Sequence, residues 1–308
     1  RAIAAVTFTE LAASELLMRV RQFVADLSAG HIADELRVAL PDGLSGAQRD
    51  NLAAASATLD EITCSTIHGF CQRLIKPYPA EADIDPGASV MDRNQADLTF
   101  LEIVDGWLRE RLSGDEGGVL AEMVLHSPRE TVALMHKIAE SLRRRRTLKA
   151  PVVSPLGGHV VTFQEVVAAF TAFVRAAAAT EPETAMIVER LGEMATALAS
   201  GPNPATPSGL VHLLVSRPHP DLCTKAGAFS SYRKKGKWTD AAKRAGLAKA
   251  DGERLNIAAE AHYAACCDAW TSLLQAAAGH VLAVLIDEAR PILQRYRDRK
   301  RTSAQLDF

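Results

Sequence analysis

The distribution of strand-like and helical segments along the chain is the feature that most restricts its fold. Short strand-like stretches occur in the first part, where Ala2–Phe8 is a compact apolar run and Glu61–Ser65 alternates apolar and polar residues. After about residue 93 the strand signals almost vanish, and apolar residues recur at helical spacing. We therefore expect a mainly α-helical protein, in which a small, incomplete α/β part precedes a larger helical part.

The spacing of apolar residues also predicts the individual helices. Leu16, Val20, Phe23 and Leu27 mark one face of a first helix, and a second, Ala-rich helix follows around 47–58. A short helix after the second strand is stopped by Pro77. Loops are expected around Pro155 with Gly157 and Gly158, and across 201–204. Further helices are predicted near 94–112, 117–126, 128–146, 163–179, 183–199, 208–215, 253–275 and 280–300.

Composition excludes several classes of protein. Of the 308 residues, 48% are hydrophobic and 23% charged, which rules out a disordered or fibrous chain. The formal net charge of −2 provides no global basic field, so any contact with nucleic acid must come from local patches. We expect no segment that spans a membrane. The chain begins at Arg1, directly before a strand-like segment, which we expect of a piece of a longer protein.

Cysteine and histidine spacing favours no metal site. The five cysteines form no CxxC pair, which argues against a disulfide framework or zinc ribbon and favours a reducing cytoplasm. His262 and Cys266 share a helix face, and His212 and His219 lie near a proline, but neither pair belongs to a four-ligand set. We interpret these residues as structural.

The sequence lacks the phosphate-binding loop of P-loop proteins. No GxxxxGK[ST] segment is present, so nothing cradles the β- and γ-phosphates of ATP. Residues 284–288 place Asp287 and Glu288 after an apolar run, as a Walker B segment would. Because Val281, Leu285 and Ile292 continue a helical face through this point, we interpret the two acids as a solvated helix pair and not as magnesium ligands.

The two junctions where a strand-like segment meets a helix carry the strongest chemical signal. Such junctions direct free helix N–H groups to the carboxyl edge of a sheet, where phosphates bind. Hydroxyls of Thr7, Thr9 and Thr66 can donate hydrogen bonds to phosphate oxygens, and the rings of Phe8 and His68 can stack on bases. The alternative for each ring is plain: a core phenylalanine at a strand end, and a histidine satisfied by local backbone.

Two basic segments are candidates for contact with duplex DNA through backbone phosphates. The first is Arg143–Arg146 with Lys149 at the end of a predicted helix. The second contains Arg233, Lys234, Lys235 and Lys237 between the aromatic residues Tyr232 and Trp238. A solvated helix face for the first segment, and a flexible loop for the second, are the alternatives.

Three stretches of the chain resemble one family. The segment AVTFTELAASEL resembles motif Ia of UvrD/Rep-type superfamily 1 DNA helicases. The segment STIHGFCQRLIKPYPAEADIDPGASVMD resembles their next motif, in the form of the exonuclease V beta subunit (RecB) and AddA branch. The tail YRDRKRTSAQLDF is similar to the segment that leads back into the motor domain. These stretches anchor residues 3–20, 62–92 and 296–308, and the helical middle is covered by order and length alone.

The resemblance implies a fold and a function. Residues 1–92 would be part of motor subdomain 1A, a P-loop NTPase-like, RecA-type α/β remnant; 93–295 would be a helical 1B-type insertion, and 296–308 the return to 1A. Contacts with single-stranded DNA are implied for Thr7, Phe8, Thr9, Thr66 and His68, although Leu11 stands where the family often has a basic residue.

For the whole protein, the resemblance implies an ATP-dependent DNA helicase that uses ATP and magnesium in double-strand break repair. An exonuclease-complex subunit would be its partner. This chain by itself is expected to bind neither ATP nor magnesium and to be inactive alone. The alternative hypothesis is a non-catalytic helical module that docks partner subunits.

Overall fold

The computed structural model describes residues 4–114 and 117–307, so Ala2, Ile3 and Phe308 of the predicted segments lie outside the described residues. About 69% of the chain is helical, which confirms the prediction of a mainly helical protein with few short strands. The chain divides into two compact units, an N-terminal unit of residues 1–96 with 299–308 and a helical unit of residues 97–298. The assignment of these parts to subdomains 1A and 1B stays a prediction.

The N-terminal unit contains two pairs of short parallel strands. Strand β1 (Ala5–Thr7) pairs with β2 (Cys64–Thr66), and β3 (Ser89–Val90) pairs with β4 (Gln305–Leu306). Sequence patterns did not predict β3 or β4, because strands of two residues carry no periodicity. The second pair brings the end of the chain back to the N-terminal unit. An ion pair between Arg301 and Asp83, with 2.7 Å between nitrogen and oxygen, supports this return.

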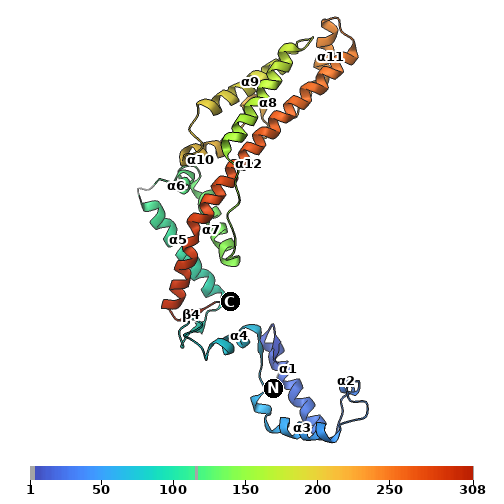
Figure 1. The fold of residues 1–308 in the computed structure, drawn as a ribbon, viewed down its shortest axis with the longest axis vertical. Coiled ribbons are helices and arrows are strands. Elements are labelled where there is room, and N and C mark those ends of the chain that lie inside the picture. The colour runs from blue at the N-terminus through green and yellow to red at the C-terminus, as the bar shows by residue number, and fades with distance from the viewer. Residues whose placement is uncertain (1–3, 115–116, 308) are drawn as a thin grey trace. The chain divides into compact units, whose positions relative to one another are not determined.

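The described part of the N-terminal unit also contains four helices. They are α1 (Glu10–Ser28), α2 (Asp34–Arg37), α3 (Gly46–Ala57) and α4 (Ile67–Ile75). Of these, α1 and α4 pack against the first strand pair. α1 and α3 lie side by side (Figure 1), and a 3₁₀ turn at Leu59–Glu61 takes the place of the predicted start of the second strand. Among the described residues of this unit, the buried apolar side chains are Ala13, Met91 and Ala96. The N-terminal unit therefore has a very small core.

Local capping explains where these helices begin. Thr9 accepts a hydrogen bond from the amide of Ala12, and Thr66 accepts one from the amide of Gly69. At α3, Ser45 and Gln48 form a reciprocal capping box. Pro77 follows the end of α4, as predicted.

The helical unit is built around three long helices. α8 (Leu156–Ala176), α9 (Pro182–Ser200) and α12 (Lys249–Thr302) run side by side, with α11 (Lys235–Arg244) at one end (Figure 1). Aromatic rings join them: Phe163 contacts Trp270 at 5.2 Å between ring centroids, and Phe173 contacts Trp238 at 6.3 Å. The remaining elements are α5 (Arg93–Ser113), α6 (Val119–His126), α7 (Pro128–Arg144), α10 (Pro207–Val215) and a 3₁₀ turn at Pro220–Leu222.

Three expectations about the helices are wrong in detail. The predicted helices 253–275 and 280–300 form one continuous helix, because Leu273, Ala277 and Val281 continue a single buried face past Gly279. α8 begins at residue 156 and not 163, because Leu156 belongs to the core. α11 was not predicted, since its lysine-rich sequence lacks an apolar period.

The expectation that no segment can span a membrane also needs correction. By length and composition alone, α8 and α12 are apolar enough to do so, with mean hydropathy values of 1.2 and 1.5 over their most apolar stretches. A core helix meets the same test. Both helices place their largest apolar side chains in the core of the helical unit, including Phe163 and Phe170 of α8 and Leu273, Leu285 and Ile292 of α12.

Candidate nucleic-acid interface

The parallel pairing of β1 and β2 brings the two predicted junctions to one edge. Thr7 lies opposite Thr66 in the register, so Phe8 and Ile67 leave the pair at the same end. α1 begins at Glu10 and α4 at Ile67, so both helix N-termini start from this edge. We call this place, formed by residues 7–10 and 66–68, the strand-end site.

Both rings of the strand-end site lie on the surface. The side chain of Phe8 is 89% exposed, which excludes the alternative of a core phenylalanine. His68 is also exposed and directly follows Ile67, whose side chain is 41% exposed. Leu11, at the often basic position, is exposed as well. The site therefore presents flat and apolar groups to solvent, as base stacking requires.

The threonine hydroxyls of the site are already engaged. Thr7 donates to the carbonyl of Thr9 at 3.0 Å, while the hydroxyls of Thr9 and Thr66 accept the capping bonds of α1 and α4. Thr66 is 7% exposed and donates its proton to Oε1 of Glu10 at 3.0 Å. Phosphate contact by Thr7 or Thr66 thus requires a change of hydrogen-bond partner.

Glu10 is the residue of this site that motif-based reasoning missed. It is the first residue of α1, where a carboxylate interacts favourably with the positive end of the helix dipole. Through Thr66 it also links the start of α1 to the start of α4. An acid immediately after an N-capping threonine was the available signal.

The basic segment 233–237 is anchored by the two aromatic residues on either side of it. Tyr232 is 8% exposed and Trp238 is completely buried, so neither ring is open to a base. The indole N–H of Trp238 donates to the hydroxyl of Tyr232 at 2.7 Å. Residues 235–237 begin α11, which corrects the alternative of a flexible loop.

Two acidic residues pair with three of the four basic residues in this segment. Lys234 and Lys237 both pair with Glu183, the latter at 2.9 Å between Nζ and Oε1, and Lys235 pairs with Glu253 at 3.4 Å. The hydrogen bonds from Lys234 and then Lys237 lower the pKa of Glu183 to about 2. Arg233 is exposed. The two acids thus offset two of the four positive charges of the basic segment.

The other basic segment, 143–149, has a structural role at its first residue. The Arg143 guanidinium lies 5.0 Å from the ring centroid of Phe100 and 5.3 Å from that of Tyr296. It also pairs with Asp97 at 2.8 Å. Because the side chain is 17% exposed, Arg143 joins α5, α7 and α12 and is not an open phosphate ligand.

The acids of the Walker-B-like segment lie inside α12, which confirms their interpretation as helix residues. The expectation that both are solvated is wrong for Glu288, whose side chain is only 21% exposed because it packs beside Arg111. Asp287 pairs with Arg290 at 3.0 Å, and Glu288 lies 3.6 Å from Arg111. No group of three or more potential metal ligands occurs within residues 4–114 and 117–307.

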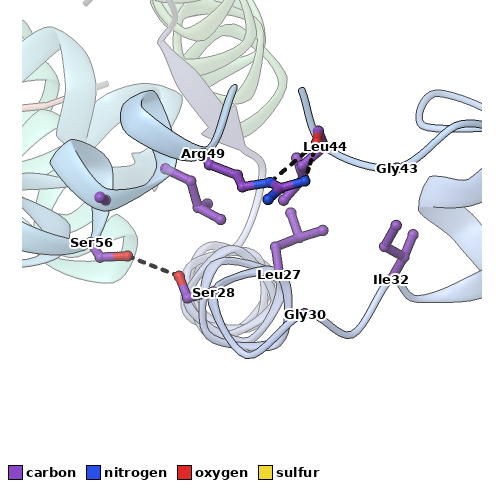
Figure 2. Close-up of a pocket in the computed structure, with 10 residues that line it drawn as sticks. Leu27, Ser28, Gly30, Ile32, Gly43, Leu44, Arg49 and Ser56 are labelled. Carbon is purple, nitrogen blue, oxygen red and sulfur yellow. Dashed lines mark hydrogen bonds between the residues drawn. The ribbon is translucent and has the colours of Figure 1, made fainter. Parts of the chain in front are cut away.

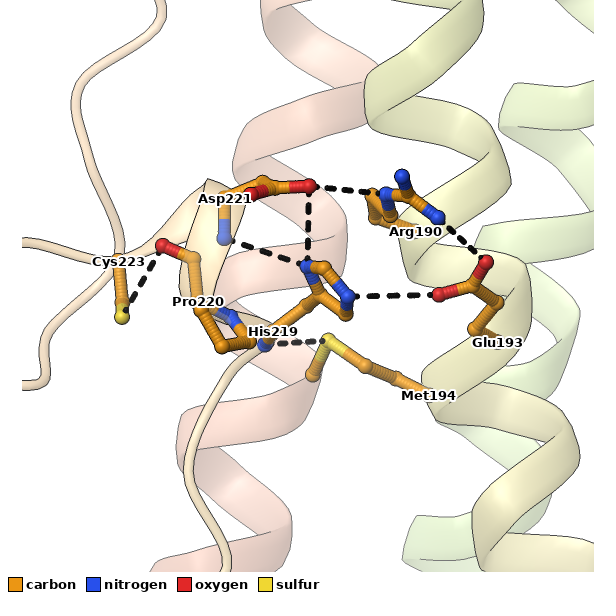
Figure 3. A network of polar contacts seen from close by, with 7 residues as sticks. All are labelled: Arg190, Glu193, Met194, His219, Pro220, Asp221 and Cys223. Atoms are coloured by element: carbon orange, nitrogen blue, oxygen red, sulfur yellow. Dashed lines mark hydrogen bonds and ion pairs between the residues drawn. The ribbon is translucent and has the colours of Figure 1, made fainter.

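The histidines and cysteines of the helical unit take part in packing. His262 stacks on Phe170 at 5.6 Å, and Cys266 is buried. In Figure 3, His219 lies between the carboxylates of Glu193 and Asp221, at 3.4 and 3.6 Å. Its Nδ1 accepts a hydrogen bond from the amide of Asp221, and Arg190 pairs with both carboxylates. This network fastens the turn at residues 220–222 to α9.

A pocket of about 720 Å³ in the N-terminal unit lies between α1, α3 and the segment that joins them (Figure 2). Its lining is mainly apolar, with Leu27, Ile32 and Leu44 among the side chains. The guanidinium of Arg49 donates twice to the carbonyl of Leu44, at 3.2 and 3.1 Å. This contact ties the segment that precedes α3 to the first turn of that helix.

Comparison with known proteins decides the family. The full chain, residues 1–308, matches the profile of the UvrD/REP helicase N-terminal domain. This chain belongs to that family. The resemblance of the chain to UvrD/Rep-type helicases is thereby confirmed.

Similar curated proteins come from one group of family members, the AddA-type ATP-dependent helicase/nuclease subunits. The chain is 33% identical over 119 residues to the AddA protein of Moorella thermoacetica, a match that covers 38% of this chain and 7% of that protein. It is 31% identical over 97 residues to the AddA protein of Desulforamulus reducens, covering 30% of this chain and 8% of the relative. The matched part is therefore less than a tenth of either relative's length.

Proposed function

We propose that this chain contributes DNA contacts to an ATP-dependent helicase that translocates on single-stranded DNA. The protein would act within an exonuclease complex in double-strand break repair, in the cytoplasm. Relatives named as helicase/nuclease subunits support this proposal. The single-stranded DNA would bind the strand-end site through Thr7, Phe8, Thr9, Thr66 and His68.

The observation that carries the proposal is the exposure of Phe8 beside the paired strand ends. A phenylalanine that is 89% exposed costs solvation free energy unless a ligand covers it. His68 lies at the same edge because Thr7 and Thr66 are in register. Two exposed rings at one edge would provide a stacking platform for bases, which requires no particular sequence.

ATP and magnesium would be used by the whole protein, but the residues of this chain do not fit them. The sequence has no glycine-rich GxxxxGK[ST] loop for the phosphates. Asp287 and Glu288 lie on a helix beside arginines, which is not the geometry of a Walker B strand end. Hydrolysis of ATP is therefore assigned to other parts of the protein.

The basic segment 233–237, at the start of α11, would contact duplex DNA in the same protein. Arg233, Lys234, Lys235 and Lys237 gather within five residues, and phosphate contacts from such a cluster are independent of sequence. Their pairing with Glu183 and Glu253 predicts a weak contact.

Fluorescence anisotropy with a labelled single-stranded oligonucleotide tests the strand-end site. Each stacked base is worth about 1–3 kcal/mol, so Phe8→Ala or His68→Ala in the 308-residue chain should weaken binding by about 5- to 150-fold. Tyr78→Ala is the matched control, because Tyr78 is a 61% exposed ring of the same unit outside the site.

The outcome separates two classes of function. Salt-sensitive binding that is lost in both variants and kept in Tyr78→Ala supports the helicase proposal. Absence of binding at low salt would reject it and favour a helical module that docks partner subunits. Circular dichroism of each variant verifies that the fold is intact.

A further inference from the structure

The first turn of α11 carries an unusual concentration of positive charge. Lys234 is the N-cap, and Lys235 and Lys237 follow in the first turn, which contains no acid. Cations at this end of a helix are opposed by the helix dipole and by one another. The arrangement therefore needs negative charge from another element.

Glu183 supplies much of that charge from the start of α9. Its two carboxylate oxygens are divided between the lysines, with Oε2 on Lys234 and Oε1 on Lys237. The side chain of Glu183 is 39% exposed and that of Lys237 is 60% exposed, so this pairing takes place at the surface. It also raises the pKa of Lys237, mainly through the hydrogen bond from Lys237 to Glu183.

Buried hydrogen bonds fix the position of Glu183. Its backbone N–H donates to Oε1 of Glu181 at 3.1 Å, and Glu181 is 2% exposed. The other oxygen of Glu181 accepts from the hydroxyl of Thr184, which in turn contacts Tyr232 at 2.6 Å. Since Tyr232 directly precedes the basic segment, the same network places both the acid and the lysines.

We infer that Glu183 is an internal counter-ion that competes with DNA phosphates for Lys234 and Lys237 and so limits the affinity of α11 for duplex DNA. This inference depends on the proposed role of the basic segment. A phosphate oxygen and a carboxylate oxygen use the same ammonium protons, so each lysine is released from Glu183 when it binds DNA. Glu183 thus lowers both the affinity and the number of counterions that DNA binding displaces.

Salt dependence gives the size of the expected effect. Each phosphate contact adds about −0.9 to the slope of log K against log salt concentration. Release of Lys234 and Lys237 in Glu183→Gln should make the slope steeper by up to about 1.8. The gain in affinity over the unchanged chain should then be about tenfold larger at 50 mM than at 200 mM salt.

The experiment is a salt series of anisotropy titrations with a labelled duplex oligonucleotide and the 308-residue chain. Glu189→Gln is the matched control, because Glu189 is exposed on the same helix and its replacement changes the net charge equally. A second background carries Lys234→Ala and Lys237→Ala. There Glu183→Gln should have no effect, since its partners are gone.

A separate variant distinguishes failure of the inference from failure of the proposed duplex contact. Arg233→Ala with Lys235→Ala removes two cations that do not pair with Glu183 and should weaken duplex binding. If it does not, the contact itself is rejected. If it does, but Glu183→Gln leaves affinity and slope unchanged or matches Glu189→Gln, the counter-ion role is overturned.

Discussion

Removal of one hydroxyl from the buried network below α11 should destabilise the helical unit strongly. The indole N–H of Trp238 donates to the hydroxyl of Tyr232, and the proton of Thr184 goes to Glu181. The hydroxyl of Tyr232 must therefore donate to Thr184, at 2.6 Å. Tyr232→Phe removes the hydroxyl in the middle of this series of hydrogen bonds.

The loss in the free energy of unfolding follows from the two polar groups that lose their partner, the indole N–H of Trp238 and the hydroxyl of Thr184. Trp238 is completely buried, so its N–H would have no partner, at a cost of about 1–3 kcal/mol. Loss of the bond to Thr184 adds about 0.5–1.5 kcal/mol. We expect Tyr232→Phe to lower the free energy of unfolding by about 2–4 kcal/mol. Tyr263→Phe, the matched control, removes one bond to the carbonyl of Ser230 and should cost about 1 kcal/mol.

Urea unfolding followed by tryptophan fluorescence measures this difference. Trp107, Trp238 and Trp270 all lie in the helical unit, so the signal reports on that unit. Because Thr184→Val removes one of the same bonds, its combination with Tyr232→Phe should cost about 1 kcal/mol less than the sum of the two. The proposed series of hydrogen bonds from Trp238 through Tyr232 to Thr184 would be refuted if Tyr232→Phe lowers the free energy of unfolding no more than Tyr263→Phe does, at an unchanged m-value.

Two further predictions concern packing and pH. Gly252→Ala would place a Cβ 2.7 Å from Cα of Thr239 and should lower the free energy of unfolding in urea by about 1–3 kcal/mol. Gly279→Ala is the control, because its Cβ would lie 3.6 Å from the nearest atom and should not destabilise the protein. Equal effects of the two substitutions would contradict this packing. Burial raises the pKa of the Cys266 thiol from 9.0 to about 12. The folded state therefore keeps its full stability with respect to this thiol below pH 9, and loses it as the pH rises towards 12, because the unfolded chain releases the proton first. Circular dichroism should show alkaline unfolding between pH 9 and 12. At pH 8 a thiol reagent should modify the exposed Cys71 well before the buried Cys266. Equal rates of modification would contradict the burial of Cys266.

Local signals predicted the two strand–helix junctions because the geometry of a junction is local. Thr9 and Thr66 each stand between a strand and a helix, and both serve as N-caps in the structure. The parallel pairing of β1 with β2 is not local, but the helices between the two strands form the crossover that a parallel pair requires. A sequence pattern is sufficient wherever residues a few positions apart determine the structure.

Patterns were insufficient where distant residues decide burial or pairing. Lys234 and Glu183 are 51 positions apart, so no local spacing indicates their ion pair. Tyr232 and Trp238 resemble surface aromatics in a lysine-rich segment, yet Phe173 of α8 packs on Trp238, and Tyr263 of α12 packs on Tyr232. Tertiary contacts override local composition at these positions.

The protein's own carboxylates occupy the groups assigned to phosphate at both proposed DNA sites. Glu10 accepts the proton of Thr66 in the N-terminal unit, and Glu183 accepts from Lys234 and Lys237 in the helical unit. A phosphate must displace these acids, so the free energy of binding is the difference between two similar interactions and is smaller than the motifs alone suggest. Such exchange is compatible with the proposed translocation, in which each step requires release of DNA as well as binding. Stacking on the exposed ring of Phe8 requires no exchange of hydrogen-bond partners, so removal of this ring should weaken single-strand binding more than removal of the Thr66 hydroxyl.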